Sequence, residues 1–120
     1  MNQPTQSRQE IEQKSTAPVL PVQVDAYKTK AIFDSGSSSS LMSLDYLKKI
    51  RPHCTVLPQQ NVRLFGASGK ELRVYMSVSC ILDFGFTQRK AIFHVVHHVS
   101  PGDLLIGTEF MDVNNISLDI

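Results

Sequence analysis

The sequence predicts a small, mostly antiparallel all-β domain that carries two short helices. Apolar and polar residues alternate with a period of two over much of the chain, which is the period of a β-strand. Clusters of Gly, Pro, Asp and Ser separate these runs at short intervals, and no alternation of strands with long helices is present. The chain has 120 residues, which is enough for one small domain.

The N-terminal segment, residues 1–17, is predicted to be a disordered leader. It is rich in Gln, Ser, Thr, Glu and Lys, and only Met1, Ile11 and Ala17 are apolar. Such a segment cannot offset the entropy of its own ordering by burying apolar surface. We therefore expect the folded domain to span residues 18–120.

The strands are predicted where the period of two is clearest. The longest such run extends from Leu72 to Leu82, and we interpret it as one half-buried strand with its serines on the outer face. The turn at residues 83–85 is expected to lead into a returning strand. The other expected strands lie around residues 22–24 and at 29–33, 90–96, 104–106 and 116–120.

Two short helices are predicted from capping residues and spacing. Ser43 is expected to cap a helix that places Leu44, Leu47 and Ile50 on one face, and Pro52 is expected to end it. A second helix of one turn is predicted over residues 108–113.

Composition excludes several classes of function. The formal net charge is +1, from 12 basic and 11 acidic residues, which gives no support for a nucleic-acid or membrane-surface partner. No apolar run approaches the roughly 20 residues that span a bilayer. Cys54 and Cys80 fit no zinc or redox spacing, so we interpret them as two reduced thiols, which weakly indicates a cytoplasmic location.

The histidines do not predict a metal site. On a strand, His94 and His98 share one face while His97 points to the other, and His53 lies elsewhere in the sequence. We therefore expect neither a metal nor a cofactor, and we interpret these residues as surface or hydrogen-bonded histidines.

Asp34 is the candidate catalytic residue. It ends an apolar run and opens a loop of Gly and Ser, where Gly36 allows the backbone to turn closely and its N–H to approach the carboxylate. The Ser35 hydroxyl can brace this loop. Two paired carboxyls that share one proton can hydrolyse a peptide bond. Taken alone, however, Asp-Ser-Gly is also ordinary turn chemistry.

Two separated segments carry motifs that belong together. Residues 31–37 read Ala-Ile-Phe-Asp-Ser-Gly-Ser. Residues 104–111 read Leu-Leu-Ile-Gly-Thr-Glu-Phe-Met, an apolar run that ends in Gly before a short helix. These segments resemble the first and second signatures of retropepsins, the aspartic proteases of retroviruses and LTR retrotransposons, with cellular relatives of the ubiquitin-shuttle type. Residues 116–120 resemble the terminal strand of the family.

The resemblance implies a small, closed, β-barrel-like fold, a two-fold homodimer and an aspartic endopeptidase that binds an extended polypeptide. It implies that Asp34 is catalytic and that Ser35, Gly36 and Ser37 support its loop. It also implies a flap, the hairpin that closes over bound peptide, and further substrate contacts. These are Phe65, Gly66, Ala67, Ser68 and Gly69 in the flap, with Ser38 and Ile106.

The sequence departs from retroviral enzymes at three positions. Ser37 stands where they usually have Ala, and a hydroxyl that donates to Asp34 would lower the pKa of that carboxyl, so we predict an acidic activity optimum. Ser38 and Thr108 stand where retroviral enzymes often carry a paired Asp and Arg. The joint absence of that pair favours the retrotransposon or cellular branch.

A single Asp-Ser-Gly segment implies that two chains build the site. No other acid of the expected domain lies in a matching loop, so Asp34 is expected to meet its own copy on a two-fold axis. The terminal strand around residues 118–120 is expected to pair at the interface. Residues 37–40 are expected to form a hydrogen-bonding loop beside the carboxylate.

Three functions remain open at the level of sequence. The chain is interpreted first as a protease that cuts a retrotransposon polyprotein of the Gag-Pol type. The alternatives are a cellular regulatory protease and a non-catalytic retropepsin-like domain for dimerisation or peptide binding.

Overall fold

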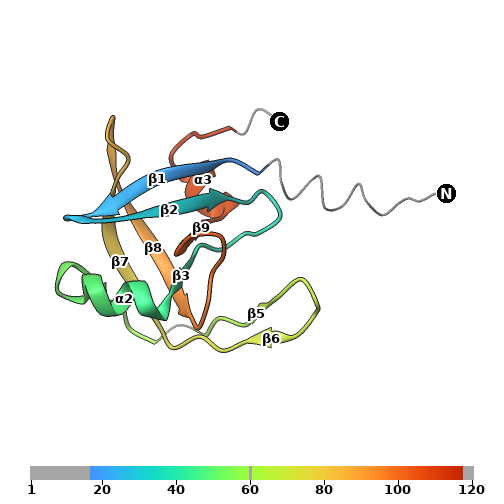
Figure 1. Ribbon diagram of the computed structural model, residues 1–120. Helices are drawn as coiled ribbons and strands as arrows, with labels where there is room; N and C mark the ends of the chain where they lie inside the picture. The colour runs from blue at the N-terminus through green and yellow to red at the C-terminus, as the bar shows by residue number, and fades with distance from the viewer. Residues whose placement is uncertain (1–16, 60, 118–120) are drawn as a thin grey trace.

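The structure, a computed structural model, describes residues 17–59 and 61–117. Strands are the main secondary structure of this part of the chain, as predicted, and the helices are short (Figure 1). In chain order the elements are β1 (Val19–Val24), β2 (Tyr27–Phe33), β3 (Leu41–Ser43), α2 (Leu44–Ile50), the 3-10 helix η1 (Arg51–His53), β4 (Thr55–Val56), β5 (Leu64–Phe65), β6 (Glu71–Leu72), β7 (Met76–Asp83), β8 (Gln88–Val96), β9 (Leu104–Ile106) and α3 (Thr108–Val113).

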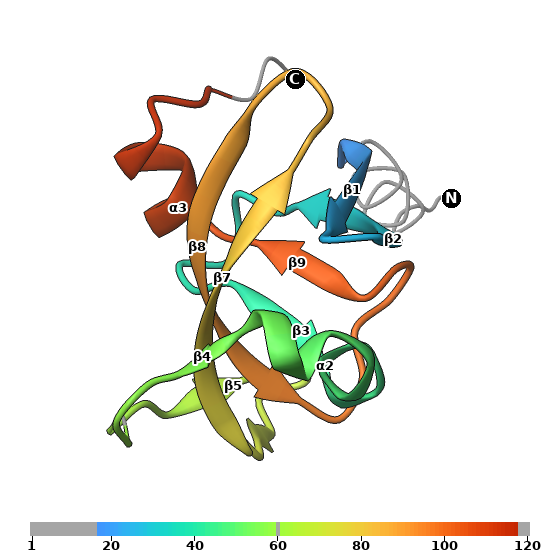
Figure 2. The ribbon, with the colours of Figure 1, turned by 90° about the vertical axis from the view of Figure 1, so that its left-hand side faces the viewer.

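Six strands close into a barrel (Figure 2). They follow one another in the order β1-β2-β9-β3-β8-β7, and β7 returns to β1 through the pair Gln23 and Asp83. β4 adds to β7 outside this ring, while β5 and β6 form a separate hairpin. Most neighbours are antiparallel, but β2 pairs with β9, and β3 with β8, in parallel. The predicted all-β class with a closed barrel is confirmed.

The core fills the barrel and continues beneath α2. Alternation along the strands turns one set of side chains inward, and α2 covers the barrel with one apolar face. None of the helices in the described ranges has the length and hydropathy of a membrane span. The largest fully buried side chains are Met42, Tyr46, Leu47, Ile50, Leu82, Phe93, Leu104 and Ile106, with Val24, Val78 and Val95.

The predicted helix after Ser43 is confirmed together with its cap. The Ser43 hydroxyl accepts a hydrogen bond from the Tyr46 N–H at 3.2 Å and donates one to Asp103 Oδ1 at 2.8 Å. Pro52 lies in η1, directly after α2 ends. The second predicted helix occupies the expected residues 108–113.

The prediction of one strand from Leu72 to Leu82 is wrong. β6 ends at Leu72 and β7 begins at Met76, because the two segments have different partners: β6 pairs with β5, whereas β7 pairs with β8. Apolar and polar residues go on alternating through residues 73–75, so the sequence pattern does not show that the strand partner changes there. Ser77, expected on the outer face, is only 5% exposed and hydrogen-bonds His94 Nδ1 at 2.7 Å.

Two predicted terminal segments lie wholly or partly outside the described residues. The predicted leader falls almost entirely on residues 1–16, which are not described. Of the predicted strand at 116–120, Ile116 and Ser117 are not in a strand, and the remaining three residues are not described.

Tyr46 is a buried polar link that the sequence analysis did not identify. Its hydroxyl accepts a hydrogen bond from the Val24 N–H at 3.3 Å and donates one to the Tyr27 carbonyl at 2.7 Å. Burial raises the pKa of Tyr46 to about 12. The hydroxyl thus ties α2 to the turn between β1 and β2.

We expect Tyr46→Phe to lower the free energy of unfolding by roughly 1–3 kcal/mol, because the buried Val24 N–H loses its partner. Urea unfolding followed by circular dichroism measures this loss. The matched control is Tyr27→Phe, at a side chain that is 41% exposed, and it should change stability little. Equal losses in the two variants would contradict the prediction.

Candidate active site

The sheet fixes the backbone of Asp34. The last residues of β2 pair in parallel with β9, so that Phe33 lies opposite Ile106. The Asp34 N–H continues this ladder and donates to the Ile106 carbonyl at 2.9 Å. The Asp34 carbonyl then accepts from the Ser37 N–H at 3.2 Å, which closes a turn. The backbone of Asp34 is therefore held by the sheet on one side, although the residue itself is the first of the loop that follows β2.

The Asp34 carboxylate is half-buried and oriented by the loop itself. The Gly36 N–H donates to Asp34 Oδ1 at 2.8 Å, which confirms the contact expected from the sequence. A Cβ at Gly36 would lie 3.2 Å from the same oxygen, so a larger residue would crowd the carboxylate. Glycine is needed at this position because the carboxylate lies so close to the backbone, and not because the backbone adopts an unusual φ angle.

The expected contact from Ser37 to Asp34 is wrong. The Ser37 hydroxyl instead donates to the Ser39 carbonyl at 2.8 Å. A carbonyl two residues along the chain is within easy reach of a serine, and this local bond turns the hydroxyl away from the carboxylate. The acidic optimum predicted from Ser37 therefore loses its physical basis.

Residues 37–40 form the hydrogen-bonding loop that the sequence predicted. The carbonyls of Ser37 and Ser38 accept from the N–H groups of Thr108 and Glu109, at 2.8 and 3.0 Å. The Ser40 hydroxyl accepts from the Gly107 N–H at 3.0 Å. The loop thus satisfies the first N–H groups of α3, which has no side-chain cap.

Gly107 packs directly against this loop. A Cβ at this position would lie 2.4 Å from the Ser39 carbonyl oxygen and 2.8 Å from the carbonyl carbon of Ser38. The two segments that carry the sequence signatures are therefore in backbone contact. A residue with a side chain at position 107 would push the Asp34 loop away from α3.

A cavity of about 610 Å³ brings the Asp34 loop together with the hairpin of residues 64–72. Among the described residues that line it, Asp34 is the sole carboxylate. The lining residues predicted from the sequence are Asp34, Gly36, Ser37, Ser38, Phe65, Gly66 and Ala67. Those that the sequence analysis missed are Ser39, Leu41, Arg63, Leu64, Leu72 and Leu105.

The prediction that Ile106 contacts substrate is wrong for its side chain. Ile106 is fully buried in the core, and Leu105 lines the cavity instead. The alternation of side chains along a strand could have shown this. Leu104 and Ile106 both point into the core, so Leu105 between them points to the opposite face of the sheet. Leu105 also lies opposite Leu41, so the two leucines share that face of the sheet.

Three other predicted site residues do not line this cavity. Ser35 is exposed within the turn that Asp34 and Ser37 close. Ser68 and Gly69 are exposed at the tip of the hairpin, where Gly69 has φ = 87°, in the left-handed region that glycine favours.

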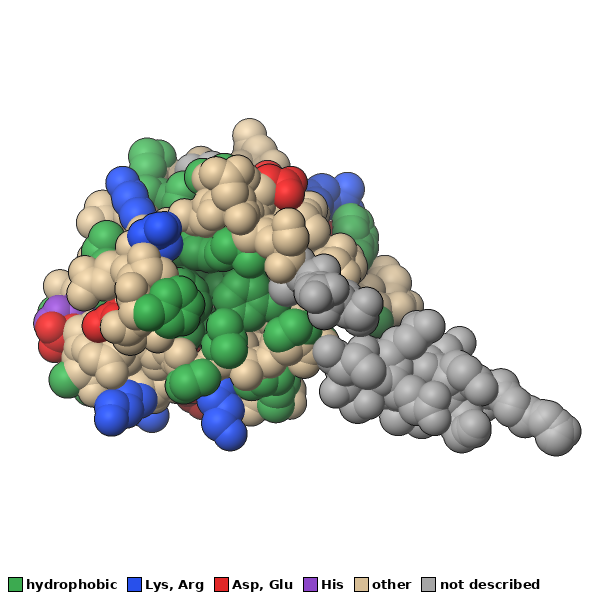
Figure 3. All heavy atoms as spheres, turned by 90° about the horizontal axis from the view of Figure 1, so that it is seen from above, with side chains coloured by type: hydrophobic (Ala, Val, Ile, Leu, Met, Phe, Trp, Pro, Cys, Tyr) green, Lys and Arg blue, Asp and Glu red, His purple; other side chains and the backbone are tan. Residues whose placement is uncertain are grey.

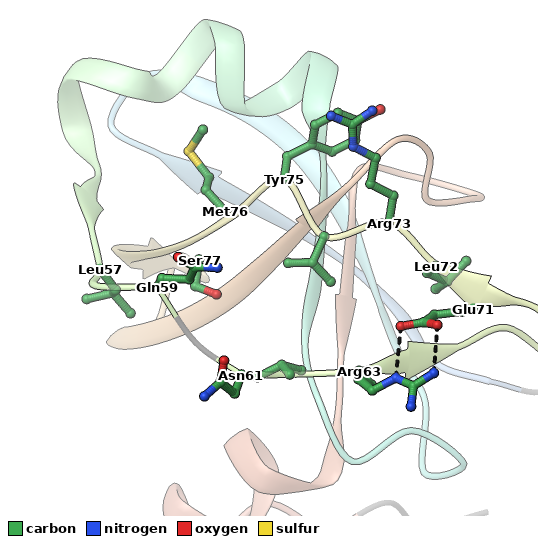
Figure 4. Close-up of a pocket in the computed structure, with 12 residues that line it drawn as sticks. Leu57, Gln59, Asn61, Arg63, Glu71, Leu72, Arg73, Tyr75, Met76 and Ser77 are labelled. Atoms are coloured by element: carbon green, nitrogen blue, oxygen red, sulfur yellow. Dashed lines mark hydrogen bonds and ion pairs between the residues drawn. The ribbon is translucent and has the colours of Figure 1, made fainter.

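The hairpin predicted around residues 65–69 is present and spans residues 64–72, and an ion pair braces its two strands (Figure 4). Leu64 pairs with Leu72, and Phe65 pairs with Glu71. The Arg63 guanidinium donates two hydrogen bonds to the Glu71 carboxylate, at 2.9 and 3.1 Å, and it lies 5.5 Å from the centre of the Phe65 ring. These hydrogen bonds hold the pKa of Glu71 below its usual value. The Arg63–Glu71 ion pair links the two strands of the hairpin near their base and leaves the tip free.

His94 is a hydrogen-bonded histidine, as the sequence analysis preferred. Its ring Nδ1 contacts the Ser77 hydroxyl, and its backbone N–H donates to the Ser40 carbonyl at 3.0 Å. Burial lowers the pKa of His94, although Glu109 acts in the opposite direction. In the described ranges, no group of three or more His, Cys, Asp or Glu side chains is arranged to hold a metal ion.

The lowered pKa of His94 predicts a pH-dependent stability. The unfolded chain binds this proton more readily than the folded chain, so the contribution is complete above about pH 6.5 and falls on acidification. We expect His94→Gln to lose less stability than the wild type between about pH 7.5 and pH 5, as measured by urea unfolding. The exposed His97, changed to Gln, is the control and should keep the wild-type slope.

An apolar face lies at the end of the barrel near the turn between β7 and β8. Figure 3 shows hydrophobic side chains gathered in a hollow on the face seen from above. A cavity of about 390 Å³ lies between that turn, β1 and the chain after α3. Phe33, which precedes Asp34, reaches it together with Leu20, Phe84, Phe86 and Ile116.

Solved structures share this architecture. The EIAV protease complexed with the inhibitor HBY-793 superposes with a TM-score of 0.68 at 12% identity, over 88% of this chain and 94% of that one. The chain has the retropepsin fold. The retroviral protease-like domain of Ddi1 from Leishmania major superposes with a TM-score of 0.60 at 17% identity, over 88% of this chain and 80% of that one.

The likeness to retropepsins is one of fold at these identities. No family model matches the chain, and no curated protein sequence matches it.

Proposed function

We propose that this retropepsin-fold chain is an aspartic endopeptidase that works as a homodimer. One observation carries the proposal: an oriented carboxylate, Asp34, lies in a cavity beneath a hairpin. The cavity is large enough for several residues of an extended peptide. Its lining supplies one acid from this chain, and the chemistry needs two.

The proposed mechanism uses the Asp34 carboxyls of two protomers as a pair. Like charges about 3 Å apart cannot both ionise, so the two groups share one proton and titrate as a unit. The ionised member removes a proton from a water molecule, and that water attacks the scissile carbonyl carbon. The protonated member donates to the carbonyl oxygen, which gives a tetrahedral diol. The diol then collapses: one of its hydroxyls returns a proton to the carboxyl that had donated, the C–N bond breaks, and the leaving nitrogen takes up the proton that the other carboxyl had removed from the water. The Gly36 N–H holds Oδ1 in place, which leaves the other carboxylate oxygen for this work.

A two-fold axis beside Asp34 supplies the second carboxylate. The exposed Ser35 would then meet its copy and hydrogen-bond across the axis. The apolar face near Phe33 supports the assembly, because exposed apolar patches of this kind mark interaction surfaces. Residues 118–120 are proposed to pair at the same interface.

The substrate is proposed to be a polypeptide in extended conformation. It would add backbone hydrogen bonds in the manner of an extra strand. The 64–72 hairpin would act as the flap, with Gly66 and Ala67 over the peptide and Ser38 below it. Closure would exclude water from the reacting groups.

The proposed biological role is the processing of a retrotransposon polyprotein of the Gag-Pol type. Ser38 and Thr108 support a branch outside the retroviral enzymes, because the charged pair often found there is absent. The likeness to the Ddi1 domain favours a second candidate, a cellular regulatory protease. Both roles use the same site and the same chemistry.

A cleavage assay with a peptide library tests the proposal, with products identified by mass spectrometry and sedimentation measured at the same protein concentration. We expect cleavage by a dimer. Absence of cleavage across a broad library and pH range, from a protein that sediments as a dimer, would support a non-catalytic domain. Activity from a strict monomer would contradict the shared site.

A further inference from the structure

Cys54 and Cys80 face each other across β4 and β7, far from the Asp34 loop. β4 pairs with β7 in a register that places Thr55 opposite Ser79 and Val56 opposite Val78. The same register, continued by one residue, sets Cys54 opposite Cys80. The two cysteines are separated in sequence by the segment that carries the hairpin, so only the strand pairing joins them.

The position of this pair on the ladder suits a disulfide. The Leu57 N–H donates to the Ser77 carbonyl at 2.9 Å, so these two residues, both labelled in Figure 4, form a hydrogen-bonded pair. Hydrogen-bonded and non-hydrogen-bonded pairs alternate along an antiparallel ladder, which makes Cys54 and Cys80 a non-hydrogen-bonded pair. At such positions the Cα atoms lie about 4.5 Å apart, within the range of roughly 4.4–6.8 Å that disulfides span.

Both thiols are free, and they differ in exposure. Cys54 is half-buried, while Cys80 is only 5% exposed. The neighbouring Cys80 lowers the pKa of the Cys54 thiol against the effect of burial, with help from Arg51. Cys54 and burial together raise the pKa of Cys80. Since Cys54 is both the more accessible thiol and the one with the lowered pKa, we assign it as the attacking thiolate and Cys80 as the resolving thiol.

We propose that Cys54 and Cys80 are a redox modification site that closes to a reversible intramolecular disulfide when the protein meets a hydroperoxide. Neither cysteine lines the cavity that holds Asp34, so the proposal does not rest on the proposed function.

The chemistry balances in two steps. The Cys54 thiolate attacks the terminal oxygen of the hydroperoxide, the O–O bond breaks, and Cys54 becomes a sulfenic acid while the alkoxide takes up the thiol proton and leaves as an alcohol. The Cys80 sulfur then attacks the Cys54 sulfur. The S–S bond forms, the S–O bond breaks, and the oxygen leaves as water with the Cys80 proton. Two thiols are oxidised by two electrons, and one hydroperoxide is reduced.

The disulfide would close the chain around the 64–72 hairpin. Both ends of the hairpin-bearing segment would be tied at its base, with the hairpin inside the covalent loop. A cross-link over a loop of this length mainly restricts the unfolded chain and so stabilises the fold. We expect the oxidised protein to melt at least about 5 °C above the reduced protein.

The test treats the purified protein with hydrogen peroxide in modest excess. We expect the intact mass to fall by two hydrogen atoms and a peptide map without reductant to contain Cys54 linked to Cys80. Under denaturing conditions no thiol should react with a thiol reagent, and dithiothreitol should restore both. Thermal unfolding before and after reduction measures the stabilisation.

Two variants separate the roles of the cysteines. Cys54→Ser should form no intramolecular disulfide, and Cys80→Ala should accumulate a Cys54 sulfenic acid that dimedone traps. Wild-type protein that only gains oxygen atoms, links two chains or melts at a lower temperature when oxidised would overturn the proposal. The wild-type mass and peptide map decide the question even where a variant folds poorly.

Discussion

Asp34→Asn is expected to reduce peptide cleavage by about 1,000-fold or more, because the shared site loses both its base and its acid. Asparagine keeps the size of the side chain, and its amide oxygen can still accept from the Gly36 N–H. The fold should therefore survive, with a melting temperature close to that of the wild type. Initial rates on a peptide from the library, measured at matched enzyme concentrations, give the ratio.

The matched control is Asp45→Asn, an exposed acid in the first turn of α2, and it should keep full activity. A mixing experiment then tests whether the site is shared. After subunit exchange with an equal amount of Asp34→Asn protein, random pairing should lower the activity of a fixed amount of wild type to about half. Unchanged activity after exchange would mean that each chain holds a complete site.

Gly107→Ala is expected to lower the free energy of unfolding by about 3 kcal/mol. Gly107 has φ = −96° and ψ = −179°, which alanine adopts freely, so the cost comes from contact rather than from backbone strain. The new methyl group would lie 2.4 Å from the Ser39 carbonyl oxygen, and backbone cannot move aside as a side chain can. Urea unfolding measures the loss.

The Asp34 loop should lose order in the same variant. Separating α3 from the loop weakens the bonds from Thr108 and Glu109 to the Ser37 and Ser38 carbonyls, so cleavage should fall together with stability. Gly66→Ala is the matched control for stability, since its Cβ would meet nothing closer than Leu72 at 3.7 Å. Equal destabilisation by both substitutions would show that packing against Ser39 is not the cause.

The sequence predicted much of the fold because its signals are local. Apolar runs and the period of two marked most of the barrel strands, although not β3. Ser43 marked the start of α2, since a cap depends on residues only three positions apart. Asp34 at the end of an apolar run was correctly placed at a strand end. The contact from Gly36 to its carboxylate followed from the same short segment.

The errors had two different causes. The break between Leu72 and Met76 reflects a change of strand partner, which the alternation of side chains does not record. The error at Ser37 is local, because its hydroxyl donates to the Ser39 carbonyl, two residues along the chain, instead of to Asp34.

The sequence by itself determined most of the barrel strands, the two helices and a carboxylate at a strand end, because turn, cap and period signals act within a few residues. Only the tertiary structure decided that β1 and β7 close the barrel and that the 64–72 hairpin shares a cavity with Asp34. It also decided that Cys54 lies opposite Cys80. These outcomes depend on the register between strands that are distant in the sequence. Burial of the whole core sets that register, and no single segment specifies it.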